Sequence, residues 1–156
     1  MEMNEAIEIY YNKTSEIYQK YNACMTIAKI YIEENKFDEA LPWLMKSYSD
    51  FERIEGVIQI VKYYMRMDRY LLAYSLALVC LFTQKFDNIG CDDFIYDFER
   101  HYLLAKICVK LEKFEEGTHH IKKAIEGLRE DYDGKKFDMY EEYIESCKEV
   151  FLATGA

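Results

Sequence analysis

The chain has 156 residues, of which 51% are apolar and 31% are charged, and its formal net charge at pH 7 is −9. This length suits one domain, and the acidic balance argues against a nucleic-acid binder, because neutralising phosphates requires a basic surface. With one proline and six glycines, the chain has too little turn chemistry for many short strands, so the composition favours helices.

Apolar residues at helical spacing predict helices along the whole chain. A short first helix is expected over residues 3–12. Three helix pairs follow, at 15–34 and 38–50, 54–67 and 70–84, and 97–111 and 115–130. Thr14 or Ser15 would cap the helix that begins near residue 15, because a hydroxyl can accept a hydrogen bond from the free amides of the first turn.

A last helix is expected near 137–152. Its apolar residues recur at helical spacing, and they are Phe137, Tyr140, Ile144, Cys147 and Phe151. Asp133-Gly134 is typical of a turn and would precede this helix.

One short phrase recurs three times: a polar turn, an aromatic residue, two spacers and a tiny residue. The tiny residues are Ala40, Ala73 and Gly117, which lie 33 and 44 positions apart. Twelve positions before each of them stands another apolar residue of small or moderate size; these are Ala28, Val61 and Ala105. Small side chains at such positions would let two antiparallel helices approach to about 8–10 Å.

This pattern resembles the tetratricopeptide repeat, whose helix pairs cross at small residues. The resemblance implies an all-α fold, an α-α superhelix of three helix pairs closed by a C-terminal capping helix. As a single domain over 1–156, it would contain repeats at about 21–53, 54–86 and 98–131 and a cap at about 137–152. Two family features are missing: Cys24, Val57 and His101 stand where the usual tryptophan would, and no proline ends a repeat.

The first helices of the three repeats carry lysines in one register, Lys29, Lys62 and Lys106. Lys62 with Arg66, and Lys106 with Lys110, are like-charge pairs one turn apart, each costing roughly 0.2–0.5 kcal/mol. One interpretation is a locally basic groove that attracts an acidic peptide or partner protein. Its candidate residues are Lys29, Lys62, Arg66, Lys106, Lys110 and Tyr102. The alternative is that these lysines only solvate helix surfaces.

An insertion at 83–97 separates the second repeat from the third. The run from Tyr63 to Arg100 is similar to a repeat module attached to certain bacterial and viral glycosyltransferases. That resemblance implies an alternative function, an accessory module of a glycosyltransferase whose catalytic domain lies elsewhere. Asp92-Asp93 is not expected to be a transferase metal motif, because the chain has no room for a nucleotide-binding α/β domain. Asp97 is expected to cap the next helix.

No catalytic, metal or cofactor site is expected from the sequence. His119 and His120 point about 100° apart on a helix, which suits one metal ion poorly, and Cys108 with His101 fits a core thiol and a helix-start residue. Five cysteines without a C-x-x-C motif favour reduced thiols and a cytoplasmic location. Neither a signal peptide nor a membrane span is expected. The main hypothesis is a non-catalytic scaffold that binds a peptide or protein, and self-association into a homodimer through 137–152 is a further possibility.

Overall fold

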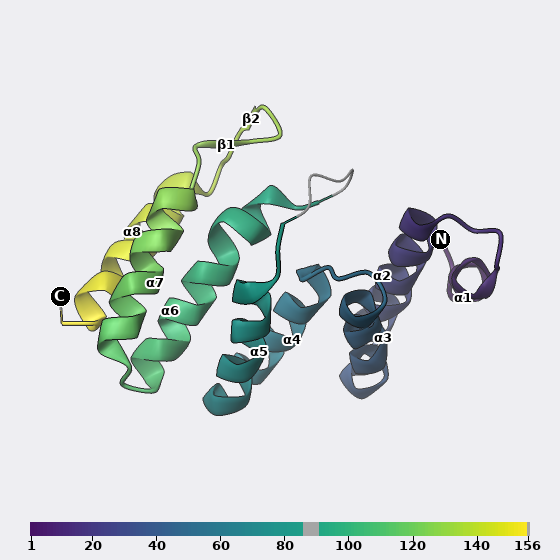
Figure 1. The fold of residues 1–156 in the computed structure, drawn as a ribbon, viewed down its shortest axis with the longest axis horizontal. Coiled ribbons are helices and arrows are strands. Elements are labelled where there is room, and N and C mark those ends of the chain that lie inside the picture. Colours follow the sequence, from purple (N-terminus) through teal and green to yellow (C-terminus); the bar gives the residue numbers. More distant parts are fainter. Residues whose placement is uncertain (86–90, 156) are drawn as a thin grey trace. The chain divides into compact units, whose positions relative to one another are not determined.

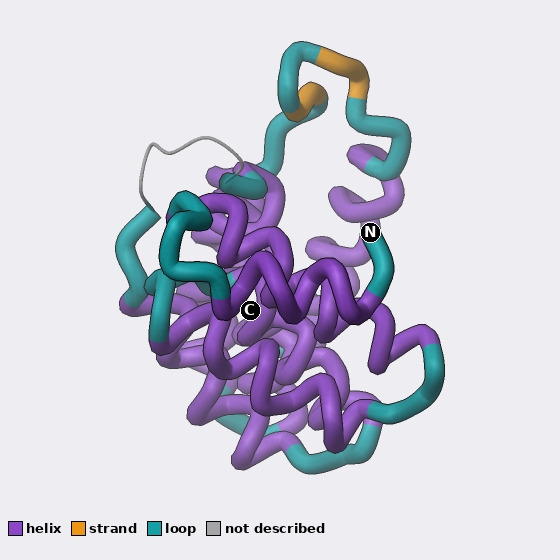
Figure 2. The backbone as a smooth tube through the Cα atoms, turned by 90° about the vertical axis from the view of Figure 1, so that its right-hand side faces the viewer, coloured by secondary structure: helices purple, strands orange, loops and turns teal. Residues whose placement is uncertain are grey.

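The computed structural model describes residues 1–85 and 91–155 and is predominantly helical (Figure 1). The helices are α1 (Met3–Tyr11), α2 (Ile17–Glu33), α3 (Phe37–Ser49), α4 (Glu55–Arg66), α5 (Tyr70–Phe82), the π-helix η1 (Ile95–Glu99), α6 (Arg100–Lys110), α7 (Phe114–Gly127) and α8 (Tyr140–Ala153). Two short strands, β1 (Asp131–Tyr132) and β2 (Lys135–Lys136), form the hairpin seen in Figure 2. The predicted all-α class is confirmed, whereas the superhelical arrangement stays a prediction.

The chain forms two compact units, Met1–Ile60 and Val61–Ala156, called here the N-terminal unit and the C-terminal unit. Helix α4 contributes residues to both. Among the described residues, no helix is long and apolar enough to cross a membrane.

Three turns between helices share one backbone conformation. Each contains a residue in the left-handed region: Asn35, Asp68 and Glu112, with φ of 60°, 56° and 58°. In each turn the next amide donates a hydrogen bond to the carbonyl five residues back, at 2.8, 2.9 and 2.8 Å respectively. This is the Schellman arrangement, which satisfies the free carbonyls at a helix end. The recurring sequence phrase therefore folds in the same way three times.

The tiny residues of the phrase lie in the first turn of the second helix of each pair. The amides of Ala40, Ala73 and Gly117 each donate to the carbonyl four residues earlier, and all three residues are buried. At Gly117, an added Cβ would lie 3.2 Å from Cys108 Cβ and 3.5 Å from the carbonyl oxygen of Ala105. The predicted close approach of residues 105 and 117 is thus observed, between α6 and α7.

The N-terminal unit packs α1 and α3 against α2 around the buried residues Ala6, Ala23 and Ile27, with Trp43 at the edge of this cluster. Helix α2 begins after Glu16, which forms a capping box with Gln19: the Glu16 amide donates to Gln19 Oε1 at 2.9 Å. The predicted cap at Thr14 or Ser15 is therefore wrong. Thr14 instead donates two hydrogen bonds to Asn12 Oδ1, at 2.9 and 2.8 Å.

The C-terminal unit has a core formed by η1, α6, α7 and α8. Its buried residues are Phe98, Ala105, Ile121, Ala124, Leu128 and Cys147. Half-buried aromatic rings surround this core, and Tyr143 of α8 contacts Phe98 edge-on with ring centroids 5.1 Å apart. Residues 137–152, expected as a capping helix, begin with a turn, and α8 covers the rest against α6 and α7.

The segment that leads into α6 differs from its prediction. Asp97 lies inside the π-helix and does not cap a helix; Asp92 does so instead, because its Oδ1 accepts a 3.1 Å hydrogen bond from the Phe94 amide. Residues 86–90 of the predicted insertion, and hence the end of the predicted repeat 54–86, lie outside the described residues. The predicted turn at Asp133-Gly134 joins β1 to β2, with φ of 58° and 74°.

Candidate binding site

A pocket of about 360 Å³ in the C-terminal unit holds most of the predicted groove residues. It is lined by Lys62, Met65, Arg66, Glu99, Tyr102, Leu103, Lys106 and Tyr143. Four of the six candidates, Lys62, Arg66, Tyr102 and Lys106, are therefore brought together; we call this the basic pocket.

Helix periodicity places these four side chains. Lys62 and Arg66 are one turn apart on α4, and Tyr102 and Lys106 are one turn apart on α6, so each pair lies on one face of its helix. The cationic pair on α4 and the tyrosine–lysine pair on α6 therefore line the same pocket from separate helices.

Tyr102 provides an aromatic wall. Its ring stacks on Phe98 with centroids 5.1 Å apart and a 20° interplanar angle, and it meets Tyr143 edge-on at 6.0 Å. Burial raises the pKa of Tyr102, so its hydroxyl stays neutral at pH 7. Lys106 Nζ lies 5.2 Å from the centre of the same ring, within the range of a cation–π contact.

Glu99 lies in the pocket and was missed by the sequence analysis. It is only 7% exposed and forms an ion pair with Lys62. The positive charge of Lys62 is therefore balanced inside the protein, and Arg66 and Lys106 supply the net positive charge. Both of these side chains are exposed. Arg66 also stands in the last turn of α4, where a cation is favoured by the helix dipole.

The two remaining candidates do not line this pocket. Lys110 Nζ lies over the ring of Tyr70, 5.9 Å from its centre. Lys29 belongs to the N-terminal unit, where it lies 4.0 Å from Glu33 with 76% of its side chain exposed. For Lys29 the geometry is that of an ordinary solvated pair one turn apart.

The acidic residues near the insertion have partners within the C-terminal unit. Lys85 Nζ lies 2.7 Å from Asp93 and 3.1 Å from Asp97, and Arg129 lies 3.5 Å from Asp93. The hydrogen bond from Lys85 lowers the pKa of Asp93. These carboxylates therefore hold residue 85 and η1 together, which is a structural role.

Comparisons with family models, curated proteins and solved structures find no match to this chain. The resemblances to tetratricopeptide repeats and to the glycosyltransferase-attached module therefore rest on the sequence patterns described above.

Proposed function

We propose that the chain is a tetratricopeptide-like, non-catalytic scaffold that binds an acidic segment of a partner protein in the basic pocket. The observation that carries the proposal is that Arg66, Lys106 and Tyr102 line one pocket, with Lys106 over the Tyr102 ring, in a protein whose net charge is −9. An isolated basic site in an acidic protein concentrates anionic ligands near itself.

The pocket combines two kinds of contact. Arg66 offers a planar fork of donors that suits a carboxylate, and Lys106 offers a point charge on the facing helix. Met65, Leu103 and Tyr143 add apolar surface next to these charges. At about 360 Å³, the pocket lies in the lower part of the size range of ligand sites, roughly 300–1,000 Å³. One acidic side chain with an apolar neighbour fits this chemistry and size.

Glu99 determines where in the pocket a ligand carboxylate binds. Its buried carboxylate neutralises Lys62, so the Lys62 side of the pocket offers an acidic ligand no net attraction. A bound carboxylate is therefore favoured next to Arg66 and Lys106 rather than next to Lys62.

This function is tested by selecting binders from a random peptide library. The affinities of the selected, labelled peptides are then measured by fluorescence anisotropy. The selected peptides should contain Asp or Glu next to an apolar residue, and their affinity should fall as salt rises. Arg66→Glu with Lys106→Glu should weaken binding at least about tenfold, the effect of losing roughly 1.4 kcal/mol of attraction.

The matched control is Lys135→Glu with Lys136→Glu, which makes the same charge change on the exposed hairpin. It should leave affinity within about twofold, and the melting temperature of both double variants should stay close to that of the parent protein. Peptides without an acidic preference, or equal binding by the two double variants, would rule out the proposed site.

A further inference from the structure

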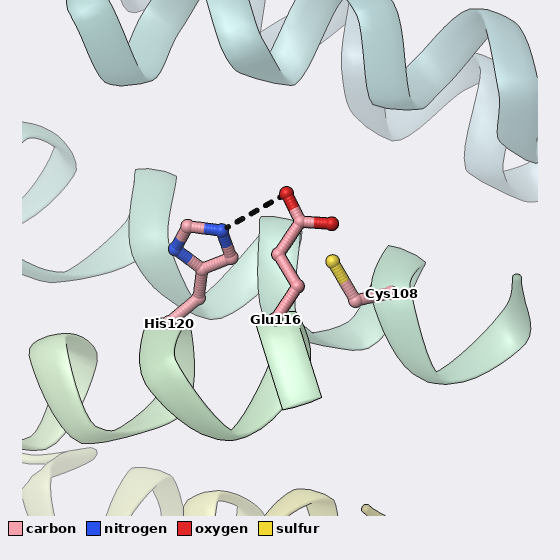
Figure 3. A group of neighbouring side chains, drawn as sticks. All are labelled: Cys108, Glu116 and His120. Carbon is pink, nitrogen blue, oxygen red and sulfur yellow. Dashed lines mark ion pairs between the residues drawn. The ribbon is translucent and has the colours of Figure 1, made fainter. Parts of the chain in front are cut away.

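A second cluster of polar side chains lies in the C-terminal unit, away from the basic pocket. Cys108 comes from the last turn of α6, and Glu116 and His120 come from α7 (Figure 3). One potential ligand atom of each residue lies within 4.8 Å of those of the other two. Figure 3 shows the Glu116 carboxylate between the thiol of Cys108 and the imidazole of His120.

The fold explains why these side chains meet. Glu116 and His120 are one turn apart on the same face of α7, and His120 Nε2 lies 3.7 Å from Glu116 Oε1. Cys108 reaches them because Gly117 has no side chain: a Cβ there would lie only 3.2 Å from Cys108 Cβ. The tiny residue of the third repeat thus brings the thiol of α6 next to α7.

His120 lacks the hydrogen bonds that a buried imidazole needs. The residue is 5% exposed, and among the described residues neither ring nitrogen has a hydrogen-bond partner, since even Glu116 Oε1 lies 3.7 Å from Nε2. Each such buried polar atom costs roughly 1–3 kcal/mol, so native proteins rarely leave one unsatisfied without a bound water or ion. This second observation is independent of the grouping of the three residues, and it points to a ligand at the ring.

We propose that Cys108, Glu116 and His120 bind one divalent metal ion of the zinc class. A thiolate, an imidazole and a carboxylate are the ligands that Zn²⁺ and Co²⁺ use in proteins, at about 2.0–2.3 Å from the metal. Tetrahedral ligands at such distances are roughly 3.3–3.8 Å from one another, so the observed spread needs only small side-chain rotations. Mg²⁺ and Ca²⁺ prefer oxygen ligands alone and do not suit a cluster with sulfur.

Metal binding releases one proton from the Cys108 thiol. The Sγ–H bond of Cys108 breaks, a sulfur–metal bond forms, and the proton passes to solvent. His120 would bind through a neutral imidazole nitrogen, which donates its electron pair to the metal.

The surroundings support a cation at this place. The Tyr74 hydroxyl donates hydrogen bonds to Glu116 Oε1 and Oε2 at 2.7 and 3.0 Å, which fixes the carboxylate as outer-shell partners of metal ligands do. A separate pocket of about 1,040 Å³ is lined by Glu116 and His120, and its other charged residues are Glu112, Glu115 and Lys113, so its carboxylates outnumber its one ammonium group. This pocket gives a metal ion access, attracts it electrostatically, and leaves room for a water or a partner side chain as fourth ligand.

Cobalt spectroscopy on the chelator-treated full chain tests the site. One equivalent of Co²⁺ should give a sulfur-to-cobalt charge-transfer band in the near ultraviolet and d–d bands in the visible, and Zn²⁺ should displace it. Cys108→Ser should abolish the charge-transfer band. His120→Gln should weaken Co²⁺ binding by more than about tenfold, the lower end of the effect of losing an outer-shell partner.

Two matched variants serve as controls. Cys147→Ser alters another buried thiol of the same unit, and His119→Gln alters the neighbouring imidazole, so both should keep the cobalt spectrum. Circular dichroism identifies any variant that fails to fold. If Cys108→Ser does not fold, the Co²⁺ affinity of His120→Gln tests the metal site. The site is refuted if the parent protein shows no charge-transfer band, or if folded His120→Gln binds Co²⁺ as tightly as the parent does.

Discussion

Lys62 and Glu99 form an ion pair that joins α4 to the π-helix η1 inside the C-terminal unit. The Glu99 side chain is 10% exposed and the Lys62 side chain is 34% exposed, so water screens the attraction only in part. A buried carboxylate that loses its cation is costly, because nothing else compensates the charge removed from water. Lys62 therefore stabilises the walls of the basic pocket, whereas Lys106 is exposed and available to a ligand.

Lys62→Ala should lower the free energy of unfolding by about 1–3 kcal/mol, a range reduced from that of fully buried pairs because Lys62 is partly exposed. Lys106→Ala is the matched control and should change it by less than about 0.5 kcal/mol. Urea denaturation followed by circular dichroism measures both. Equal effects of the two substitutions would show that the ion pair contributes nothing beyond an ordinary surface lysine.

Gly127 allows α7 to touch the backbone of η1. A Cβ at this position would lie 1.8 Å from the carbonyl oxygen of Asp97, and a backbone atom cannot rotate away as a side chain can. Gly127→Ala should therefore destabilise the protein by about 3 kcal/mol or more, in spite of the better helix propensity of alanine. Thermal melting measures this, with Glu126→Ala as the exposed neighbour control. A Gly127→Ala protein as stable as the parent would contradict the close contact.

The helices and the turns between them could be predicted because their signals are local. Apolar spacing and a polar turn before an aromatic residue lie within a few neighbouring positions, so the phrase around Ala40, Ala73 and Gly117 identified three equivalent turns. The same register placed Lys62 and Lys106 on α4 and α6, where they line one pocket. Lys110 does not line this pocket, and the pattern alone does not tell how far along a helix a pocket extends.

The π-helix explains what the sequence did not reveal about Asp97 and Glu99. A π turn adds a residue to the helical repeat, which rotates the side chains after it relative to an α-helix. A pattern based on 3.6 residues per turn therefore could not show that Glu99 is buried opposite Lys62. The role of Asp97 was missed for a different reason, because its partner Lys85 lies twelve positions earlier.

The cluster of Cys108, Glu116 and His120 needed helix packing to be seen. The pair Glu116 and His120 has a visible one-turn spacing, but Cys108 lies on another helix and eight positions earlier. The adjacent histidines His119 and His120 look equivalent in the sequence, but only His120 of the two is buried. Gly117 lets Cys108 approach α7, since a Cβ at this position would lie only 3.2 Å from Cys108 Cβ.

Glu112 adopts a backbone conformation that suits glycine better. Its φ is 58°, and a side chain in the left-handed region costs roughly 1 kcal/mol that glycine avoids. Glu112→Gly should raise the free energy of unfolding by about 0.5–1 kcal/mol. Lys122→Gly, in the exposed middle of α7, should lower it by about 1 kcal/mol. Urea midpoints measured side by side check the opposite signs, and a loss of stability in both variants would contradict the turn geometry.

Acid should destabilise the C-terminal unit through His101. Burial, reinforced by the positive charge of Arg100, lowers the pKa of His101 from 6.5 to about 4. Between these two values the unfolded chain binds a proton that the folded protein does not. The free energy of unfolding therefore falls as the pH drops through this window, by up to about 1.4 kcal/mol per pH unit, and His101 adds no further loss below about pH 4. The lowered pKa of His120 acts in the same direction.

His101→Leu removes this titration and should flatten the pH dependence between pH 6.5 and about 4, while the lowered pKa of His120 still acts in the same direction. Urea denaturation at a series of pH values, with a chelator present to keep metal away from His120, measures the slope. His119→Gln, at an exposed neighbour of His120, serves as the comparison, and its curve should follow that of the parent protein more closely than the His101→Leu curve does. If the His101→Leu and parent curves run parallel from pH 7 to pH 4, His101 does not carry the acid sensitivity, and its buried Nδ1 must gain a partner on protonation.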